Sequence, residues 1–365
     1  MKKKILAVLS IPIVLLALVS AIAATNAFPR RMGEVYTIDN AAAGNNVLRF
    51  DRSSNGVLTA SGNFSTHGLG TGGKLASQGA VVLSENGKWL LVVDAGSNQT
   101  SVFKIKGNTL TFTDIESSHG LTPISIAIND NLVYVLNNGS STVAGNIAGF
   151  WLNKSGMLNY ISGSNEPLSG SANTSPEQIG FNPAGDVLVV TEKATGMIDT
   201  YTIDMDGNAS APIVTASNSP GPYGFAFNSY GYLVLSEAAS NTMSSYAVNG
   251  MAQLRTISGS IPDFGNAPCW VITTGNGKFA YTTNAHGGTI SGYAISYTGT
   301  LSLFSSIAAK VNVPALDLAF STSSKFLYTL NGNHITGFQA YSDGSLSWVT
   351  TVTGLPASTT GLAAT

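Results

Sequence analysis

Residues 268–304 read PCWVITTGNGKFAYTTNAHGGTISGYAISYTGTLSLF, and this stretch decides the fold. It opens with a short apolar run (268–273) and a Gly-Asn-Gly turn, followed by a second apolar run that ends at Asn284. An alternating strand with Tyr293 comes next, and a fourth apolar run follows at 301–304. Short runs of β-branched and aromatic residues between Gly, Asn and Ser turns are typical of strands. The stretch therefore predicts one unit of four antiparallel strands.

The same unit recurs along the chain at a spacing of about 45 residues, apart from a longer third copy, and this period is typical of β-propeller blades. Six copies begin at Gln78, Pro123, Pro176, Pro222, Pro268 and Ala315. The two ends supply a seventh, because Glu34–Asp39 reads as a second strand with no first, and Thr360–Ala364 as a first strand with nothing after it. We predict an all-β, seven-bladed propeller of four-stranded antiparallel blades. Its ring is closed by pairing of the N- and C-terminal strands, which leaves no open sheet edge.

The N-terminus predicts export. Lys2–Lys4 form a basic start, Ile5–Ala24 is apolar, and small-x-small cleavage sites follow at Ala21–Ala23 and Thr25–Ala27. We interpret residues 1–27 as a signal peptide and residues 28–365 as one propeller domain. The alternative is an uncleaved membrane anchor, because the apolar run is long. The expected location is secreted, extracellular or cell-surface, with membrane contact only through this segment if it is retained.

Composition excludes several function classes. The net charge is −2 and the basic residues are scattered, so no nucleic-acid partner is expected. Cys269 is the single cysteine, which excludes an intrachain disulfide, and without an adjacent basic residue it is expected to be packed and inert. The run Gly68–Lys74 imitates a phosphate-binding loop, but it leads into a strand rather than a helix, so we interpret it as a linker.

The repeats at 176–204, 222–248, 268–295 and 315–341 resemble the lactonase-type seven-bladed propellers. The resemblance is carried by PEQIGFNPAG at 176–185, YTTN at 281–284 and the ending GLAA at 361–364. That family includes the 6-phosphogluconolactonases and the fungal 3-carboxymuconate cyclases, and is related to the YVTN-repeat surface proteins. The resemblance covers nearly the whole mature chain. It implies the propeller fold and, for enzymes of the family, His and Arg side chains facing the central channel, often as Pro-Arg-His.

This chain departs from that pattern. The equivalent positions read Glu177-Gln178, Tyr223-Gly224, Cys269-Trp270 and Leu316-Asp317. None of the five arginines (30, 31, 49, 52 and 255) falls in a predicted first strand. An anionic lactone or muconate would lack the guanidinium that binds carboxylate or phosphate bidentately. We therefore expect a degenerate family active site.

A polar residue ends the second strand of every predicted blade. These ring residues are Asp39, Asp94, Asn137, Glu192, Glu237, Asn284 and Asn331. One interpretation is structural, since such side chains bond the turn amides of their own blade. The other concerns Glu192 and Glu237 on neighbouring blades, where repulsion raises the pKa of one carboxyl or draws in a cation. Glu192 or Glu237 would then act as a general acid, or the pair with Asn284 would hold Ca²⁺; otherwise no cofactor is expected.

A second set faces the predicted channel from the first strands. Its members are Gln78, Ser125, Glu177, Gln178, Tyr223, Trp270 and Asp317. Aromatic rings among amides and carboxylates suit a small polar or sugar-like ligand, with Tyr223 or Trp270 as a stacking face. The alternative is that these two rings fill the channel. His286 follows Asn284 by two residues and is the candidate general base, unless it is simply a solvated loop histidine.

The third copy carries two Gly-, Ser- and Asn-rich inserts, at Ser140–Ile147 and Gly163–Ser175, which are expected to be surface loops. Our leading hypothesis is a secreted, lactonase-like propeller that binds a ligand or acts as a scaffold. One alternative is a hydrolase or cyclase acting on a lactone of a sugar acid or muconate. Its acid/base would be Glu192 or Glu237, with Gln178 or Asn284 stabilising the oxyanion. A second alternative is a cell-surface module that binds a protein on one propeller face.

Overall fold

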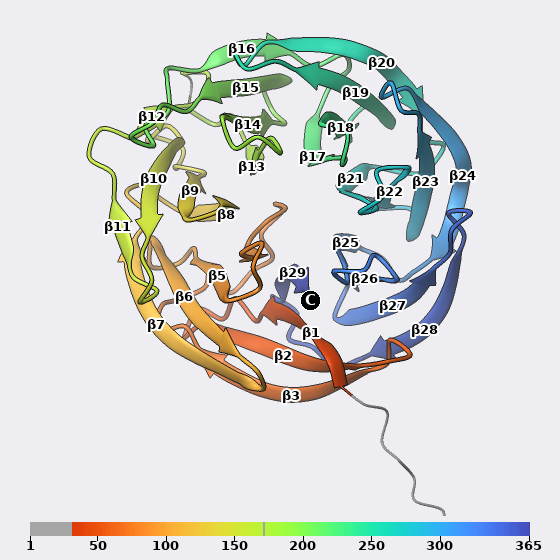
Figure 1. Ribbon diagram of the computed structural model, residues 1–365, viewed down its shortest axis with the longest axis horizontal. Coiled ribbons are helices and arrows are strands. Elements are labelled where there is room, and N and C mark those ends of the chain that lie inside the picture. The colour runs from red at the N-terminus through yellow and green to blue at the C-terminus, as the bar shows by residue number, and fades with distance from the viewer. Residues whose placement is uncertain (1–30, 171) are drawn as a thin grey trace, which may run out of the picture.

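The chain folds into seven β-sheets that stand like blades around one axis in a computed structural model, which describes residues 31–170 and 172–365 (Figure 1). Six of the sheets have four antiparallel strands, and the third blade along the chain has one further short strand. The predicted seven-bladed propeller is confirmed. The predicted signal peptide at residues 1–27 lies outside the described residues. Within the described part of the chain, no helix is long and apolar enough to cross a membrane.

The strands are counted outward from the axis, and the blades are numbered 1 to 7 in chain order. The first strands are β29 (Thr360–Ala364), β4 (Val81–Leu83), β8 (Pro123–Asn129), β13 (Pro176–Phe181), β17 (Pro222–Phe227), β21 (Pro268–Thr273) and β25 (Ala315–Phe320). The second strands are β1 (Arg31–Ile38), β5 (Trp89–Asp94), β9 (Leu132–Asn137), β14 (Val187–Glu192), β18 (Tyr232–Glu237), β22 (Phe279–Asn284) and β26 (Phe326–Asn331). The third strands are β2 (Asn46–Ser53), β6 (Gln99–Lys106), β10 (Asn146–Leu152), β15 (Met197–Thr202), β19 (Thr242–Val248), β23 (Thr289–Ile295) and β27 (His334–Ala340). The outermost strands are β3 (Leu58–Ser65), β7 (Thr109–Ser117), β11 (Leu158–Tyr160) with β12 (Glu166–Pro167), β16 (Ile213–Ala216), β20 (Leu254–Pro262), β24 (Leu301–Lys310) and β28 (Leu346–Val352).

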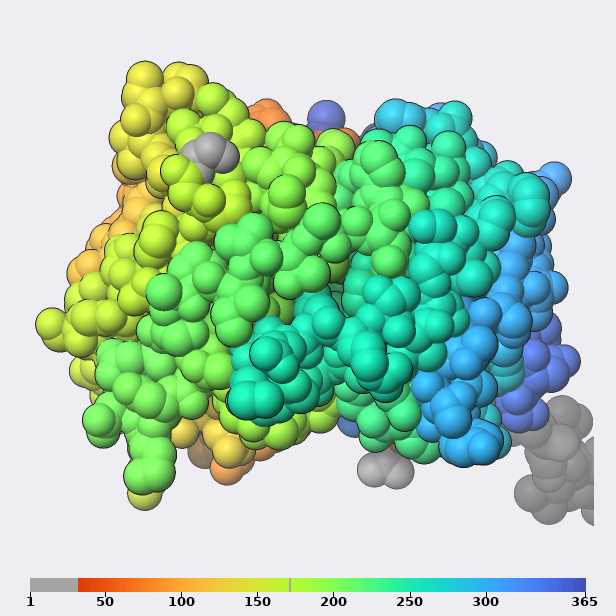
Figure 2. All heavy atoms as spheres, turned by 90° about the horizontal axis from the view of Figure 1, so that it is seen from above, coloured from red at the N-terminus to blue at the C-terminus, as the bar shows by residue number. Residues whose placement is uncertain are grey.

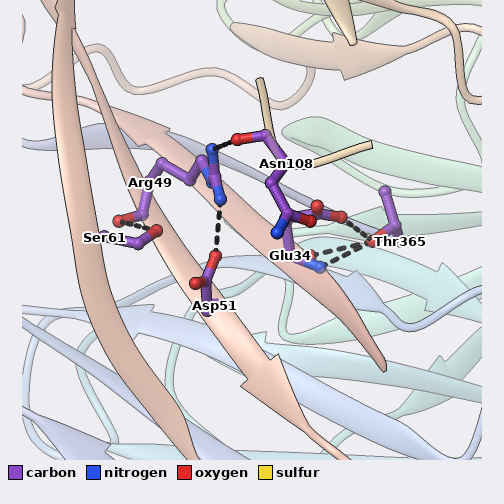
Figure 3. Close-up of polar contacts among 6 residues, drawn as sticks. All are labelled: Glu34, Arg49, Asp51, Ser61, Asn108 and Thr365. Carbon is purple, nitrogen blue, oxygen red and sulfur yellow. Dashed lines mark hydrogen bonds and ion pairs between the residues drawn. The ribbon is translucent and has the colours of Figure 1, made fainter. Parts of the chain in front are cut away.

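The two ends of the chain close the ring in blade 1, as predicted. The C-terminal strand β29 pairs antiparallel with β1. Figure 3 shows the last contact, in which the Thr365 N–H donates to the Glu34 carbonyl at 2.9 Å and the Thr365 hydroxyl to the Glu34 carboxylate at 2.9 Å. The Glu34 N–H in turn donates to the Thr365 hydroxyl at 2.7 Å. The C-terminal strand thus occupies the inner edge of β1, and Glu34 and Thr365, which are 331 positions apart, lie in one sheet.

Two arginines of blade 1 bind neighbouring parts of the ring, one to blade 2 and one to the closing C-terminus. Arg49 on β2 donates to the Asn108 carbonyl of blade 2 at 2.7 Å and to the Asp51 carboxylate at 2.8 Å (Figure 3). Arg52, also on β2, donates to the Thr365 carbonyl at 3.0 Å. The expectation that these two arginines lie outside the first strands is confirmed.

The two faces of the propeller are distinguished by strand direction. On the upper face the first strands begin and the second strands end, and the lower face is the opposite one. The predicted insert Ser140–Ile147 joins β9 to β10, and the insert Gly163–Ser175 leads from β11 to β13, so both lie on the upper face. Figure 2 shows the disc edge-on, with the yellow segment of the first insert rising above the upper rim. The inserts therefore rim the end of the channel at which the candidate site residues lie.

Tyrosines from the second strands of blades 3, 6 and 7 bind each of these blades to the next. Tyr134, Tyr281 and Tyr328 are completely buried, and each phenol donates to a glycine carbonyl in the outer turn of the following blade. The acceptors are Gly207, Gly344 and Gly56, at 2.7, 2.7 and 2.8 Å. A buried aromatic ring with a bonded hydroxyl stabilises the interface without leaving a polar group unpaired.

One strand is shorter than the sequence predicts. The first strand of blade 2 was expected to run from Gln78 to Leu83, but β4 covers only Val81–Leu83. The residues before it leave the sheet and enter the central channel. This departure from the repeat determines what the channel contains.

Candidate functional site

The upper part of the central channel is occupied by a piece of the chain itself, Leu75–Gly79, which we call the channel segment. It leads from the glycine-rich linker after β3 to β4, and in Figure 1 it is the orange trace that reaches toward the middle of the ring. Just before it, Lys74 donates to the Gly332 carbonyl of blade 7 at 2.8 Å. Gly68–Lys74 is a connection between blades with no helix after it, as predicted.

Side chains from the far side of the ring hold the channel segment in place. The Tyr223 hydroxyl donates to the Ala76 carbonyl at 2.7 Å, and the Trp270 indole N–H donates to the Ser77 carbonyl at 2.9 Å. The Gln78 amide spans the channel, donating to the Val271 carbonyl at 2.7 Å and accepting from the Val271 N–H at 2.9 Å. Gln78, Tyr223 and Trp270 therefore meet in the channel, where their polar groups bind the protein's own backbone.

Two other predicted ligand residues satisfy the inner edges of the first strands. Gln178 on β13 donates to the Phe225 carbonyl at 3.0 Å and accepts from the Phe225 N–H at 2.7 Å, so it bridges to β17. Asp317 on β25 accepts from the N–H groups of Leu318 at 2.8 Å and Leu362 at 3.1 Å. Burial raises the pKa of Asp317 to about 8. The first strand of a propeller has no neighbour on its inner side, and here side chains supply the missing partners.

Glu177 is a buried acid among the predicted ligand residues. It is 2% exposed, and its carboxylate lies 3.3 Å from the Ser175 hydroxyl and 3.8 Å from the Lys193 ammonium. Burial raises the pKa of Glu177 to about 8, while Lys193 opposes the rise. The Lys193 ammonium also lies 5.4 Å from the centre of the Tyr223 ring. Burial with Glu177 nearby raises the pKa of the Cys269 thiol to about 12, which keeps this thiol protonated and unreactive at neutral pH.

Three of the ring residues, Glu192, Glu237 and Asn284, bind groups of their own blade or of the loop that precedes it. Glu192 accepts from the N–H and the hydroxyl of Ser169 at 2.9 and 2.7 Å, and from the Thr195 hydroxyl. The donors to Glu237 are the Ser219 N–H and the hydroxyls of Ser217, Thr242 and Ser244. Asn284 donates to the hydroxyls of Thr289 and Ser291. The side chains of all three are inaccessible to solvent.

The two predicted acid/base residues are not brought together. No hydrogen bond or ion pair among the described residues joins Glu192 to Glu237, and their carboxylates are already surrounded by donors. Calcium takes six to eight oxygen ligands. Among the described residues no group of three or more His, Cys, Asp or Glu side chains converges. A calcium ion held by the pair with Asn284, and the role of either glutamate as acid or base, stay predictions.

Blade 4 differs from its neighbours at one position beside the ring. Seven residues after the ring residue, blades 2, 5 and 6 place the hydroxyls of Ser101, Ser244 and Ser291, each of which bonds that residue. Blade 4 places Asp199 there, fully buried and on the same sheet face as Glu192. Burial and the nearby Glu192 carboxylate raise the pKa of Asp199 to about 8. Asp199 therefore holds a proton at neutral pH.

His286 lies apart from this network. It is exposed in the upper-face turn between β22 and β23, where its backbone N–H donates to the Asn266 carbonyl at 3.1 Å. Its role as a general base stays a prediction. The sequence analysis did not identify Lys193 or Asp199. The signal for Lys193 was its position directly after Glu192, and the signal for Asp199 was the seven-residue spacing that it shares with the three serines.

The opposite end of the channel is open. A cavity of about 500 Å³ lies at the lower face, between the ends of five first strands. The residues that line it include the apolar Val82 and Ile126 and the polar Asn129 and Thr273. Glu85 is the titratable residue in this wall. The cavity suits a small neutral molecule that combines apolar and hydroxyl groups.

Comparison with known proteins agrees with the fold. The family model described as "Lactonase, 7-bladed beta-propeller" matches residues 35–145 and 145–359. A protein from Lactobacillus plantarum has a similar structure, with a TM-score of 0.74 and 15% identity over 92% of this chain and 100% of that one. The periplasmic gluconolactonase of Pseudomonas aeruginosa gives a TM-score of 0.68 and 16% identity over 90% and 98%. A search of curated proteins finds no match. At these identities the solved structures support the fold alone.

Proposed function

Because the chain belongs to the lactonase family of seven-bladed β-propellers, we propose that it is a binding or scaffold member of that family and does not open lactones. One observation carries the proposal. The channel segment fills the end of the channel where the first strands begin, and Tyr223, Trp270 and Gln78 hold it there. The space in which a channel substrate would lie is thus taken by the protein's own backbone.

The chemistry of the remaining side chains supports the same conclusion. Opening a lactone needs a group that activates the attacking water and donors that stabilise the oxyanion. Of the predicted oxyanion donors, Asn284 donates its amide hydrogens to Thr289 and Ser291, and Gln178 donates one to the Phe225 carbonyl. No arginine lies in any first strand of the described chain.

The lower cavity is where we place the ligand. Its volume of about 500 Å³ falls within the range of small-molecule sites. Apolar residues such as Val82 and Ile126 line it together with the polar Asn129 and Thr273. A small polar or sugar-like molecule matches this wall better than an anionic substrate would.

The proposal also includes export of the protein from the cell. The basic start at Lys2–Lys4 and the apolar run Ile5–Ala24 favour secretion, with cleavage near Ala23 or Ala27. If the apolar run is retained, the propeller would instead be displayed at the cell surface, where either face is available to a protein partner. Mass spectrometry of the exported protein distinguishes the two by the presence or absence of residues 1–27.

The alternative, a hydrolase or cyclase acting on a lactone, is favoured by one observation. Glu177 is a buried carboxyl in the channel with a raised pKa and a neighbouring cation, which is a common arrangement for an acid/base residue. In that case Glu177→Gln would abolish turnover. Loss of turnover in Glu192→Gln or Glu237→Gln would instead favour the acid/base residues predicted from the sequence.

The test is turnover of sugar lactones and muconolactones by the folded protein, followed in a pH-stat with and without Ca²⁺ or EDTA. Our proposal predicts rates indistinguishable from spontaneous opening in every case. Opening at an enzyme-like rate that Glu177→Gln removes would overturn it in favour of the hydrolase.

A further inference from the structure

A groove at the lower face, outside the channel, is lined by three lysines that form no ion pair with the described residues. It has a volume of about 890 Å³ and lies between blades 2 and 3. We call it the lysine groove. It is lined by Asn86, Lys88, Trp89, Lys104, Asp130, Asn131, Leu152, Asn153 and Lys154. Its turns adjoin those that line the channel cavity, because Glu85 and Asn129 precede Asn86 and Asp130 directly.

The backbone on both sides of the lysine groove is held rigidly. In blade 2 the Asn86 side chain accepts from the Lys88 N–H at 3.0 Å. In blade 3 the Asn153 side chain accepts from the N–H groups of Ser155 and Met157, at 2.8 and 3.1 Å. The second turn also docks on blade 2, since Thr113 donates to the Gly156 carbonyl at 3.0 Å. Lys88 and Lys154 are therefore presented from fixed turns.

Trp89 forms the floor between these turns. It is 8% exposed and lies directly opposite Lys104 in the pairing of β5 with β6. The Lys104 ammonium lies over the indole ring, 5.7 Å from its centre, so this charge sits on the aromatic floor. The groove thus has an aromatic floor and three cationic groups above it.

The charge of the lysine groove is not neutralised by the protein. It contains three lysines and one acid, Asp130, so its net charge is +2 (3 − 1) in a chain whose net charge is −2. Among the described residues, none of Lys88, Lys104 and Lys154 takes part in an ion pair. Unpaired cations that converge on a concave surface concentrate anions from solution.

We propose that the lysine groove binds a carboxylated oligosaccharide. Ammonium groups of lysine act as point charges for carboxylates, and the amides of Asn86, Asn131 and Asn153 can exchange hydrogen bonds with sugar hydroxyls. The groove is open and extends over two blades, which suits a short chain of sugar acids better than a single small ion. The lysine groove is separate from the channel, so a test of this proposal does not depend on whether the channel cavity binds a ligand.

The test uses the whole protein with trigalacturonic acid as the probe, measured by calorimetry at low salt, with maltotriose as the neutral comparison. We expect trigalacturonic acid to bind and maltotriose not to bind. Lys88→Gln and Lys154→Gln should each weaken binding about tenfold, and 0.5 M salt should weaken it strongly. The matched controls Lys278→Gln and Lys325→Gln, on lower-face turns of other blades, should change affinity less than twofold. Asp130→Asn should tighten binding.

Three results would overturn the proposal. The first is no binding of trigalacturonic acid at low salt. The second is equal weakening by the control lysines, which would indicate a diffuse charge effect. The third is tripolyphosphate binding more tightly than trigalacturonic acid, which would indicate a phosphate site instead of a sugar-acid site.

Discussion

Asp199 and Glu192 lie on the same face of the sheet in blade 4, and both side chains are completely shielded from solvent. Neither oxygen of the Asp199 carboxyl has a hydrogen-bond partner among the described residues. Burial and the nearby Glu192 carboxylate raise the pKa of Asp199 to about 8, so this carboxyl holds a proton at neutral pH. Glu192 also anchors Ser169 of the second insert, so the protonated Asp199 lies beside a carboxylate that holds part of the upper face.

Asp199→Ser should stabilise the protein at pH 8. The substitution gives blade 4 the hydroxyl that Ser101, Ser244 and Ser291 provide in their own blades. It removes a buried acid, and a gain on the order of 2 kcal/mol in the free energy of unfolding is expected. Urea denaturation measures it. The converse change, Ser244→Asp beside Glu237, should destabilise, and a stabilising effect there would contradict the interpretation.

Stability should fall as the pH rises from 5 to 8. Burial raises the pKa of Glu177, Asp199 and Asp317 to about 8 in each case. The same groups ionise near roughly pH 4 in the unfolded chain. Between these values the folded state binds more protons than the unfolded state, so the free energy of unfolding decreases with pH and levels off above about pH 8. Urea midpoints at pH 5, 6.5 and 8 measure the slope, and a midpoint that is constant or rises would disagree with these shifts.

Trp270→Phe should loosen the channel segment without emptying the channel of its aromatic ring. The indole N–H that bonds the Ser77 carbonyl is lost, which leaves a buried acceptor unpaired at a cost of about 1–3 kcal/mol. Tyr223→Phe, which removes the bond to the Ala76 carbonyl, should act in the same direction. Unfolding in urea gives the cost. Phe227→Leu, a change in the lower cavity, is the control that should leave the channel segment undisturbed.

Gly70→Ala should destabilise strongly, because the linker crosses the chain at close range there. A Cβ at Gly70 would lie 2.1 Å from the Asn40 carbonyl carbon, which is backbone and cannot yield. We expect a loss of about 2–4 kcal/mol. Gly73→Ala is the matched control, since a Cβ at Gly73 meets nothing within 4 Å. Thermal unfolding of both variants measures the difference, and equal midpoints would show that the linker is not constrained at Gly70.

Much of the fold could be predicted because each blade repeats a local pattern. The strands β17 (Pro222–Phe227) and β22 (Phe279–Asn284) have the bounds that the sequence predicts, since each is an apolar run bounded by turn residues. The closure of Thr360–Ala364 on β1 followed from counting strands. These are signals within one blade or at the two ends of the chain.

The contents of the channel could not be predicted in the same way. Tyr223 and Trp270 were recognised as channel residues, but their partners Ala76 and Ser77 lie 147 and 193 positions away. Nothing in the pattern around residue 76 indicates that the chain leaves its blade there. The one available hint was that the copy starting at Gln78 lacks the proline that begins four of the others.

The most direct test of the central claim is amide hydrogen exchange of the channel segment in the wild-type protein. If Leu75–Gly79 fills the channel, the Gln78 N–H, which donates to the Glu177 carbonyl at 3.0 Å, should exchange as slowly as the N–H groups of β13. Exchange as fast as that of the upper-face insert Ser140–Ile147 would mean that the channel is open in solution, and the argument against lactone chemistry would fail.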